Sequence, residues 1–157
     1  MSRHPFYKRL FKEYKEISNN DLPGIKLIST NEDNLTQFLF QMNIKDNPIY
    51  LENENYYLSI TITNDYPIDS PSVKFIKLNP SDKIVLHNHV YSNGHLCLSI
   101  LGEDWTPACT IQSILLSIQS MLQRNTSKER PPDDAQYVRH APIDPKDSNF
   151  VYHDDNV

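Results

Sequence analysis

The stretch HNHVYSNGHLCLSIL at residues 87–101 carries the least generic chemistry of this 157-residue chain, and WTPA follows it at residues 105–108. It holds three of the six histidines, one of the two cysteines and the dipeptide Asn93-Gly94. Asn-Gly favours a turn with special backbone angles, and such turns usually lie at the surface. We therefore expect Cys97 to lie within a few residues of solvent, and we interpret it as a catalytic nucleophile.

Three other interpretations of this stretch stay open on the residues alone. A cysteine flanked by leucines is often an inert buried residue, and Cys109 fits that description. His87, His89, His95 and Cys97 are suitable zinc ligands, although four ligands within eleven residues leave little room to close a tetrahedron. A cysteine hydrolase would need a distant His and Asp, and the sequence has no local signature for one.

The composition indicates one domain in a reducing compartment. A chain of 157 residues can bury one core without staples, and its two cysteines do not make a disulfide framework. The formal net charge of −5 argues against a nucleic-acid or anionic-membrane partner. No apolar run approaches the roughly 20 residues that span a bilayer, and the N-terminus lacks a signal-peptide pattern. We expect an intracellular protein of the cytoplasm and nucleus.

Upstream of the quoted stretch, residue spacing predicts one helix and then four strands. Tyr7, Leu10 and Tyr14 recur at helical spacing, and Pro23-Gly24 lies in the turn that follows. Alternating apolar residues then predict antiparallel strands with one solvated face. These strands are expected at residues 24–30, 35–44, 56–63 and 72–77.

Downstream, an apolar stripe predicts a central core helix that follows Thr110 as N-cap and runs to Leu122. Two prolines and two acids favour a short helix over residues 135–140. The expected fold is α+β, with an N-terminal helix, a four-stranded antiparallel meander, an active-site loop, the core helix and a short last helix. We expect this domain at residues 1–141 and a flexible tail at residues 142–157.

The quoted stretch resembles the active-site block of ubiquitin-conjugating enzymes. In that family a His-Pro-Asn triplet precedes the catalytic cysteine by the distance that separates residues 87–89 from Cys97. The family's Tyr-Pro turn is similar to YPIDSP at residues 66–71. The order of the predicted elements is also that of the ubiquitin-conjugating fold, so the resemblance covers roughly residues 8–123 in general form.

Further motifs resemble the W-type members, which attach ubiquitin to protein N-termini. Those members carry His where the triplet usually ends in Asn, and this chain has His89 there. They also carry a His-x-Cys-Leu-Ser run, which residues 95–99 match. The runs EDW, RPPD, YVR and YHDD, at residues 103–105, 130–133, 137–139 and 152–155, extend the match almost to the C-terminus.

The resemblance implies an acyltransferase. Cys97 would accept the C-terminal glycine of ubiquitin as a thioester from an activating enzyme, and an amine would then attack that thioester. A thiolate serves as the nucleophile in the first step and as the leaving group in the second. His89 is implied as a second catalytic residue, acting either as a donor to the oxyanion or as a support of the loop. No cofactor or metal is expected in this chain, because the activating enzyme uses the ATP.

The same resemblance implies a set of supporting residues. Ser99 stands where many members carry an acid that assists lysine. A lysine with a pKa near 10.4 is only about 0.1% neutral at pH 7.4, whereas an α-amine near 7.8 is about a quarter to a third neutral. We therefore expect a preference for N-terminal amines. Asn88 replaces the triplet's Pro, and Glu129 and Asp133 both fit the acidic position beyond the core helix. The whole set is His87, Asn88, Asn93, His95, Ser99, Glu129 and Asp133.

The implied partners are ubiquitin, the ubiquitin-activating enzyme, RING or U-box ubiquitin ligases and substrates with flexible N-termini. Ligases would dock on the first helix, the Tyr-Pro turn and the loop ending in Pro-Ala, through Arg9, Ile68, Pro107 and Ala108. Many members carry Phe at the position of Ile68. The alternative function is an inactive variant of this fold that binds ubiquitin or a ligase without carrying ubiquitin. The presence of Cys97 favours the enzyme.

Overall fold

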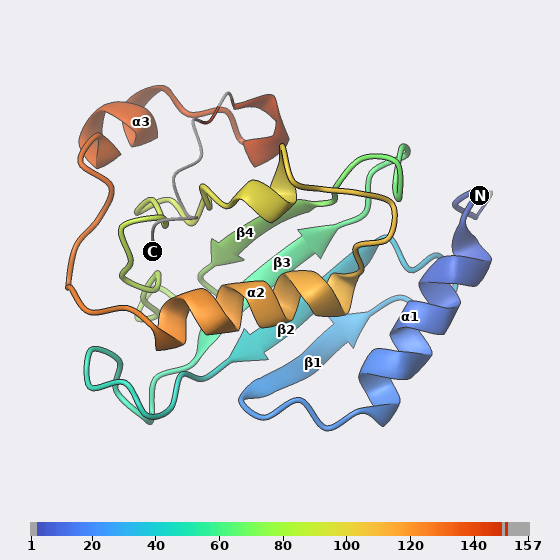
Figure 1. Cartoon of the computed structure of the whole chain (residues 1–157), viewed down its shortest axis with the longest axis horizontal. Helices are drawn as coiled ribbons and strands as arrows, with labels where there is room; N and C mark the ends of the chain where they lie inside the picture. Colours follow the sequence, from blue (N-terminus) through green and yellow to red (C-terminus); the bar gives the residue numbers. More distant parts are fainter. Residues whose placement is uncertain (1–2, 149, 151–157) are drawn as a thin grey trace.

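The computed structural model describes residues 3–148 and residue 150. A helix, four strands and two further helices follow one another along the chain (Figure 1). One short 3₁₀ helix precedes the second α-helix, and another follows the third. Their bounds are α1 Tyr7–Asn19, β1 Ile25–Thr30, β2 Gln37–Met42, β3 Tyr56–Thr61, β4 Ser72–Ile76, η1 Ser99–Leu101, α2 Ile111–Gln123, α3 Asp134–His140 and η2 Pro145–Asp147. The predicted α+β class and the predicted order of helices and strands are confirmed.

The four strands form one antiparallel sheet in the order β1-β2-β3-β4. One row of core side chains crosses it, because Phe40 pairs with Leu58 and Leu58 pairs with Phe75. All three are at most 1% exposed. In Figure 1, α2 crosses one face of this sheet, α1 lies beyond β1, and α3 lies on the side of β4. The sheet and α2 are therefore the frame on which the quoted stretch is mounted.

α2 begins as the sequence predicts. Thr110 is its N-cap: the side chain of Thr110 accepts a hydrogen bond from the amide of Ser113 at 3.1 Å, and the Ser113 hydroxyl accepts one from the amide of Thr110 at 2.7 Å. At the other end, the amide group of Asn47 donates to the carbonyls of Leu122 and Asn125 at 3.1 and 2.9 Å. The carbonyls at the end of the helix are thus satisfied by a loop far away in the sequence. The buried face is Ile111, Ile114, Leu115, Ile118, Met121 and Leu122.

The first residues beyond the predicted domain boundary at residue 141 make contacts with β4 and with the turn that precedes it. The Ser72 hydroxyl of β4 donates to Asp144 at 2.8 Å, and the Lys146 ammonium donates to Asp69 at 2.8 Å. Polar side chains of this segment thus bond to β4 and to the turn before it, and η2 packs beside β4. The remaining tail, residues 149 and 151–157 with the YHDD run, lies outside the described residues, and its flexibility stays a prediction. No helix in the described part of the chain is long and apolar enough to cross a membrane.

Candidate active site

Gly94 is the point at which the backbone of the active-site loop packs directly against β4. Its φ is +93°, a conformation that favours glycine. A Cβ placed there would lie 1.9 Å from the carbonyl oxygen of Phe75, while the Phe75 amide donates to the Gly94 carbonyl at 2.9 Å. The side chain of Asn93 accepts from the His95 amide at 3.1 Å. The Asn-Gly turn was expected at the surface, but Gly94 is buried because the loop folds back against β4.

Two hydrogen bonds join His89 and Cys97, one between their backbones and one from the His89 side chain to the Cys97 backbone. The Cys97 amide donates to the His89 carbonyl at 2.9 Å, and Nδ1 of His89 lies 3.2 Å from the Cys97 carbonyl oxygen. Both residues are 8% exposed. A carbonyl can only accept, so Nδ1 of His89 must carry the proton that it donates. The predicted pair is therefore brought together, with the imidazole bound to the backbone of the cysteine.

His87 lies under this pair as a structural group. Its side chain is fully buried, and its Nδ1 accepts from the His89 amide at 2.9 Å. Burial and the neighbouring His89 lower the pKa of His87 from 6.5 to about 4. His87 is therefore a neutral buried support of the turn.

Cys97 and His89 open into a cavity of about 490 Å³. The active-site loop, the segment from Glu129 to Asp133 and the aromatic rings of Tyr137 and Phe150 all line this space. Both acids that fitted the predicted acidic position line this space. The lining residues are Asn88, His89, Tyr91, Cys97, Glu129, Arg130, Pro131, Pro132, Asp133, Tyr137 and Phe150.

A tyrosine that the sequence reasoning missed distinguishes the two acids. The Tyr91 hydroxyl donates to both carboxylate oxygens of Asp133, at 3.1 and 3.2 Å. Burial first, and then the bond to Asp133, raise the pKa of Tyr91, so its phenol stays a donor at neutral pH. The Tyr91 ring stacks on Tyr137 with centroids 3.9 Å apart, and Phe150 stacks on Tyr91 while its ring is tilted relative to Tyr137. The sequence carries no signal for this contact, because Tyr91 and Asp133 are 42 residues apart.

His95 and Ser99 support the loop from outside the cavity. Nδ1 of His95 lies 2.7 Å from the Tyr137 hydroxyl, which lies 2.8 Å from the Ser148 hydroxyl. Burial lowers the pKa of His95, so this imidazole is neutral near pH 7. Ser99 begins η1 and is 5% exposed, and its carbonyl accepts from the Asp104 amide. The rings of Tyr91, Tyr137 and Phe150 and the hydroxyl of Ser148 thus pack together with the active-site loop.

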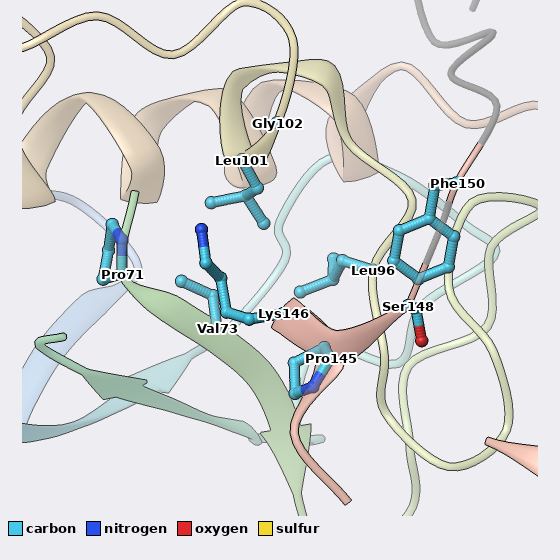
Figure 2. Close-up of a pocket in the computed structure, with 9 residues that line it drawn as sticks. All are labelled: Pro71, Val73, Leu96, Leu101, Gly102, Pro145, Lys146, Ser148 and Phe150. Carbon is cyan, nitrogen blue, oxygen red and sulfur yellow. The ribbon is translucent and has the colours of Figure 1, made fainter. Parts of the chain in front are cut away.

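A smaller pocket, of about 160 Å³, lies on the other side of the loop. Figure 2 shows Leu96, Leu101 and Val73 around this space, with Lys146 beside them and Phe150 next to Leu96. Lys146 donates to the Ser70 hydroxyl at 2.8 Å, and that hydroxyl donates to the Leu101 carbonyl at 2.7 Å. The segment around η2 therefore braces the 3₁₀ helix that follows Cys97.

The residues predicted to bind a ligase form a separate surface. Ile68 is 69% exposed, and Pro107 and Ala108 are exposed. Trp105 donates from its indole to the Pro67 carbonyl at 2.9 Å, which joins the turn to the loop. The guanidinium of Arg9 donates to the carbonyls of Pro107 and Cys109. Arg9 therefore holds this surface together from within.

The histidines and cysteine of the quoted stretch do not converge as metal ligands. Nδ1 of His87, of His89 and of His95 contact three different groups: an amide, a carbonyl and a phenol. Within residues 3–148 and residue 150, no three His, Cys, Asp or Glu side chains gather as metal ligands would. The zinc interpretation thus gains no geometric support.

Known proteins match this chain along nearly its whole length. The family described as "Ubiquitin-conjugating enzyme" matches residues 9–146. A Dictyostelium discoideum protein named probable ubiquitin-conjugating enzyme E2 W is 41% identical over 153 residues, which cover 97% of each chain. A Danio rerio protein named probable ubiquitin-conjugating enzyme E2 W-A is 41% identical over 149 residues, which cover 94% of this chain and 95% of that one.

A solved structure matches the fold as well. The crystal structure of the ubiquitin-conjugating enzyme E2 UbcA1 from Agrocybe aegerita superposes with a TM-score of 0.81 at 38% sequence identity. The match covers 88% of this chain and 96% of that chain.

Proposed function

Because this chain belongs to the ubiquitin-conjugating enzyme family and is most like its W-type members, we propose that Cys97 carries ubiquitin and passes it to N-terminal amines. The observation that carries this proposal is the pairing of Cys97 with His89 in the lining of a cavity that Asp133 also lines. Members of this family are transferases that work with ubiquitin, an activating enzyme and a ligase.

The proposed reaction has two acyl transfers. The Cys97 thiolate attacks the carbonyl of the ubiquitin C-terminal glycine, and the sulfur of the activating enzyme leaves. An amine nitrogen then attacks the same carbonyl, its C–N bond forms, the C–S bond to Cys97 breaks, and the nitrogen loses a proton. Thiolate is a good nucleophile and a good leaving group, which suits both steps. ATP is consumed upstream, so no cofactor is needed on this chain.

His89 is proposed to position Cys97. Its Nδ1–H donates to the Cys97 carbonyl, which fixes the plane of the imidazole relative to the cysteine. In the neutral ring the other nitrogen is then an acceptor, and only the imidazolium could donate from both nitrogens to a developing oxyanion. The contact therefore supports the loop-holding role of His89 at neutral pH.

Asp133 is proposed to receive the amine. Tyr91 donates to both of its oxygens and so orients the carboxylate at the edge of the cavity. Glu129 lines the same cavity and is the weaker candidate, because no such contact orients it among the described residues. Ser99 supplies no negative charge beside Cys97, which favours an amine that is already neutral. An α-amine is neutral a few hundred times more often than lysine at pH 7.4.

A RING or U-box ligase is proposed to dock on Ile68, Pro107 and Ala108. These side chains are exposed on one joined surface, and Arg9 holds the loop from which two of them project. The predicted location in the cytoplasm and nucleus follows from the need to keep Cys97 reduced.

Amine competition tests the proposed function. Enzyme charged with ubiquitin is offered two peptides of one sequence, one with a free N-terminus and an acetylated lysine, the other with an acetylated N-terminus and a free lysine. We expect transfer to the first peptide to be at least tenfold faster, because its amine is neutral far more often. Equal rates, or faster transfer to lysine, would contradict the amine preference. A second measurement tests the carrier residue: Cys97→Ser should transfer ubiquitin to neither peptide by a thioester. Cys109→Ser is its control and should behave as wild type, since Cys109 lies outside the cavity.

A further inference from the structure

Arg130 binds the backbone of the active-site loop at three points. Its Nη1 donates to the carbonyls of Val85 and Val90 at 2.6 and 3.1 Å, and its Nη2 donates to the Ile84 carbonyl at 2.8 Å. These carbonyls flank the turn that carries His87 and His89. One guanidinium therefore spans both ends of that turn.

This part of the loop has little sheet pairing of its own. Isolated bridges join His87 to Val90 and Val90 to Leu96 in place of a continuous ladder. Buried carbonyls need a donor, and between Ile84 and Val90 side chains from distant segments supply several. Besides Arg130, the Tyr50 hydroxyl donates to the Leu86 carbonyl at 2.8 Å, and Asn125 donates to the same oxygen at 3.3 Å.

Arg130 also connects two segments that line the cavity. Its side chain bonds to the backbone on both sides of the turn with His89, and its own backbone continues into Pro131, Pro132 and Asp133, which line the same cavity as His89. Pro131 is buried, and a proline restricts the backbone of the residue before it. The planar fork of an arginine can serve carbonyls that diverge, which the single ammonium of a lysine cannot reproduce.

We propose that Arg130 is a positioning residue for ubiquitin transfer: it sets the separation between the turn bearing His89 and the segment bearing Asp133. The inference rests on the proposed function of Cys97 as the carrier of ubiquitin. Arg130 acts on the reaction through the backbone of residues 84–90, to which its guanidinium is bonded.

The chemical test is single-turnover discharge of the charged enzyme to a peptide with a free N-terminus, normalised to the charged fraction. Arg130→Ala should lower the rate at saturating peptide by roughly 10- to 100-fold, because small displacements of reacting groups cost that much. Arg130→Lys should fall between the alanine variant and wild type. The peptide concentration for half-maximal rate should change little, and added guanidinium ion should restore part of the rate of Arg130→Ala.

Arg124→Ala is the matched control. Arg124 is exposed, and its Nε donates to the Ser120 carbonyl within its own helix at 3.3 Å. This variant should discharge at the wild-type rate and should not respond to guanidinium. The inference would be overturned by a wild-type rate for Arg130→Ala, or by a change only in the peptide concentration for half-maximal rate. An equal response of both variants to guanidinium would also overturn it.

Amide hydrogen exchange tests the inference without any ubiquitin chemistry. The amides of His89, Val90 and Cys97 are hydrogen-bonded within the loop. In Arg130→Lys they should exchange faster while the amides of α2 keep their protection, which also shows that the variant is folded. Unchanged exchange in the loop would overturn the inference. A wild-type protein that never transfers ubiquitin would instead refute the proposed function, so the two failures are distinguishable.

Discussion

The core helix α2 and the active-site loop at residues 84–97 satisfy most of their polar backbone groups in different ways. α2 bonds its own backbone along its length and is capped at its N-terminus by Thr110, although its C-terminal carbonyls take a distant donor from Asn47. The loop instead receives donors from Tyr50, Asn125 and Arg130. Local bonds depend on neighbours in the sequence, whereas borrowed donors depend on the whole fold. We therefore expect substitutions in the core of α2 to change mainly the free energy of unfolding, and substitutions at the contacts of the loop to change the rate of ubiquitin discharge as well.

The largest expected loss of stability comes from the helix. Leu115 is fully buried in α2, so Leu115→Ala should lower the free energy of unfolding by about 2–5 kcal/mol through lost burial and a cavity. The discharge rate per folded, charged molecule should stay at the wild-type value. Urea denaturation and single-turnover discharge measure the two quantities. A discharge rate that fell with stability would break the division between the regions.

The next effect comes from the attachment of the loop. Gly94→Ala would place a Cβ against the Phe75 carbonyl in a backbone conformation that favours glycine, and we expect it to cost about 2–4 kcal/mol of unfolding free energy. Unlike Leu115→Ala, it should also abolish most discharge, because Cys97 moves with the loop. Gly24→Ala is the control: Gly24 has a φ of +79°, its Cβ would lie 2.6 Å from the Asn43 carbonyl oxygen, and it is outside the loop, so this variant should lose stability and keep its discharge rate. Normal discharge by Gly94→Ala would contradict the account.

Low pH should reduce the free energy of unfolding, because His87 in the active-site loop is buried as a neutral imidazole. The folded chain keeps His87 neutral down to a pKa of about 4, whereas the unfolded chain binds a proton near pH 6.5. The stability that this group contributes is therefore present above pH 6.5 and is lost as the pH falls toward 4, by about 2 kcal/mol between pH 7.5 and pH 5. Urea denaturation at the two pH values measures the loss. His87→Gln should lose less over that interval than wild type or His140→Gln, whose histidine is exposed.

The smallest effect on stability should come from Tyr91→Phe. Losing the bond to Asp133 should cost only about 0.5–1.5 kcal/mol of unfolding free energy, yet discharge should slow several-fold because the carboxylate is no longer oriented. Tyr14→Phe removes a comparable bond from a tyrosine to Glu32 on the exposed side of α1, and it is the matched control. Equal discharge rates in the two variants would show that Tyr91 does not orient Asp133.

The elements with local signals were the ones that the sequence predicted. The apolar stripe and Thr110 predicted α2 to within a residue at each end, and alternation placed the strands, although β2 and β3 are shorter than expected. The family resemblance, carried by the spacing from His89 to Cys97, is confirmed by the family match. The roles of those two residues stay predictions.

The contacts of the site could not be predicted in the same way. Arg130 bonds to carbonyls 40 to 46 residues earlier, and Asn47 caps a helix end 75 residues later. Neither pairing leaves a period or a motif in the sequence. The contacts of residues 142–148 also lack a sequence signal, because Asp144 and Lys146 have the pattern of solvated charges and their partners, Ser72 of β4 and Asp69, are more than 70 residues away.

The central claim is that Cys97 carries ubiquitin, and intact-mass measurement of the charged protein tests it most directly. Wild-type protein incubated with activating enzyme, ATP and ubiquitin should gain the mass of one ubiquitin less one water, and reductant should remove it. Cys97→Ser should form an adduct that resists reductant, and Cys97→Ala should form none while Cys109→Ser charges normally. An unmodified wild-type protein, or a reducible adduct on Cys97→Ala, would contradict the account.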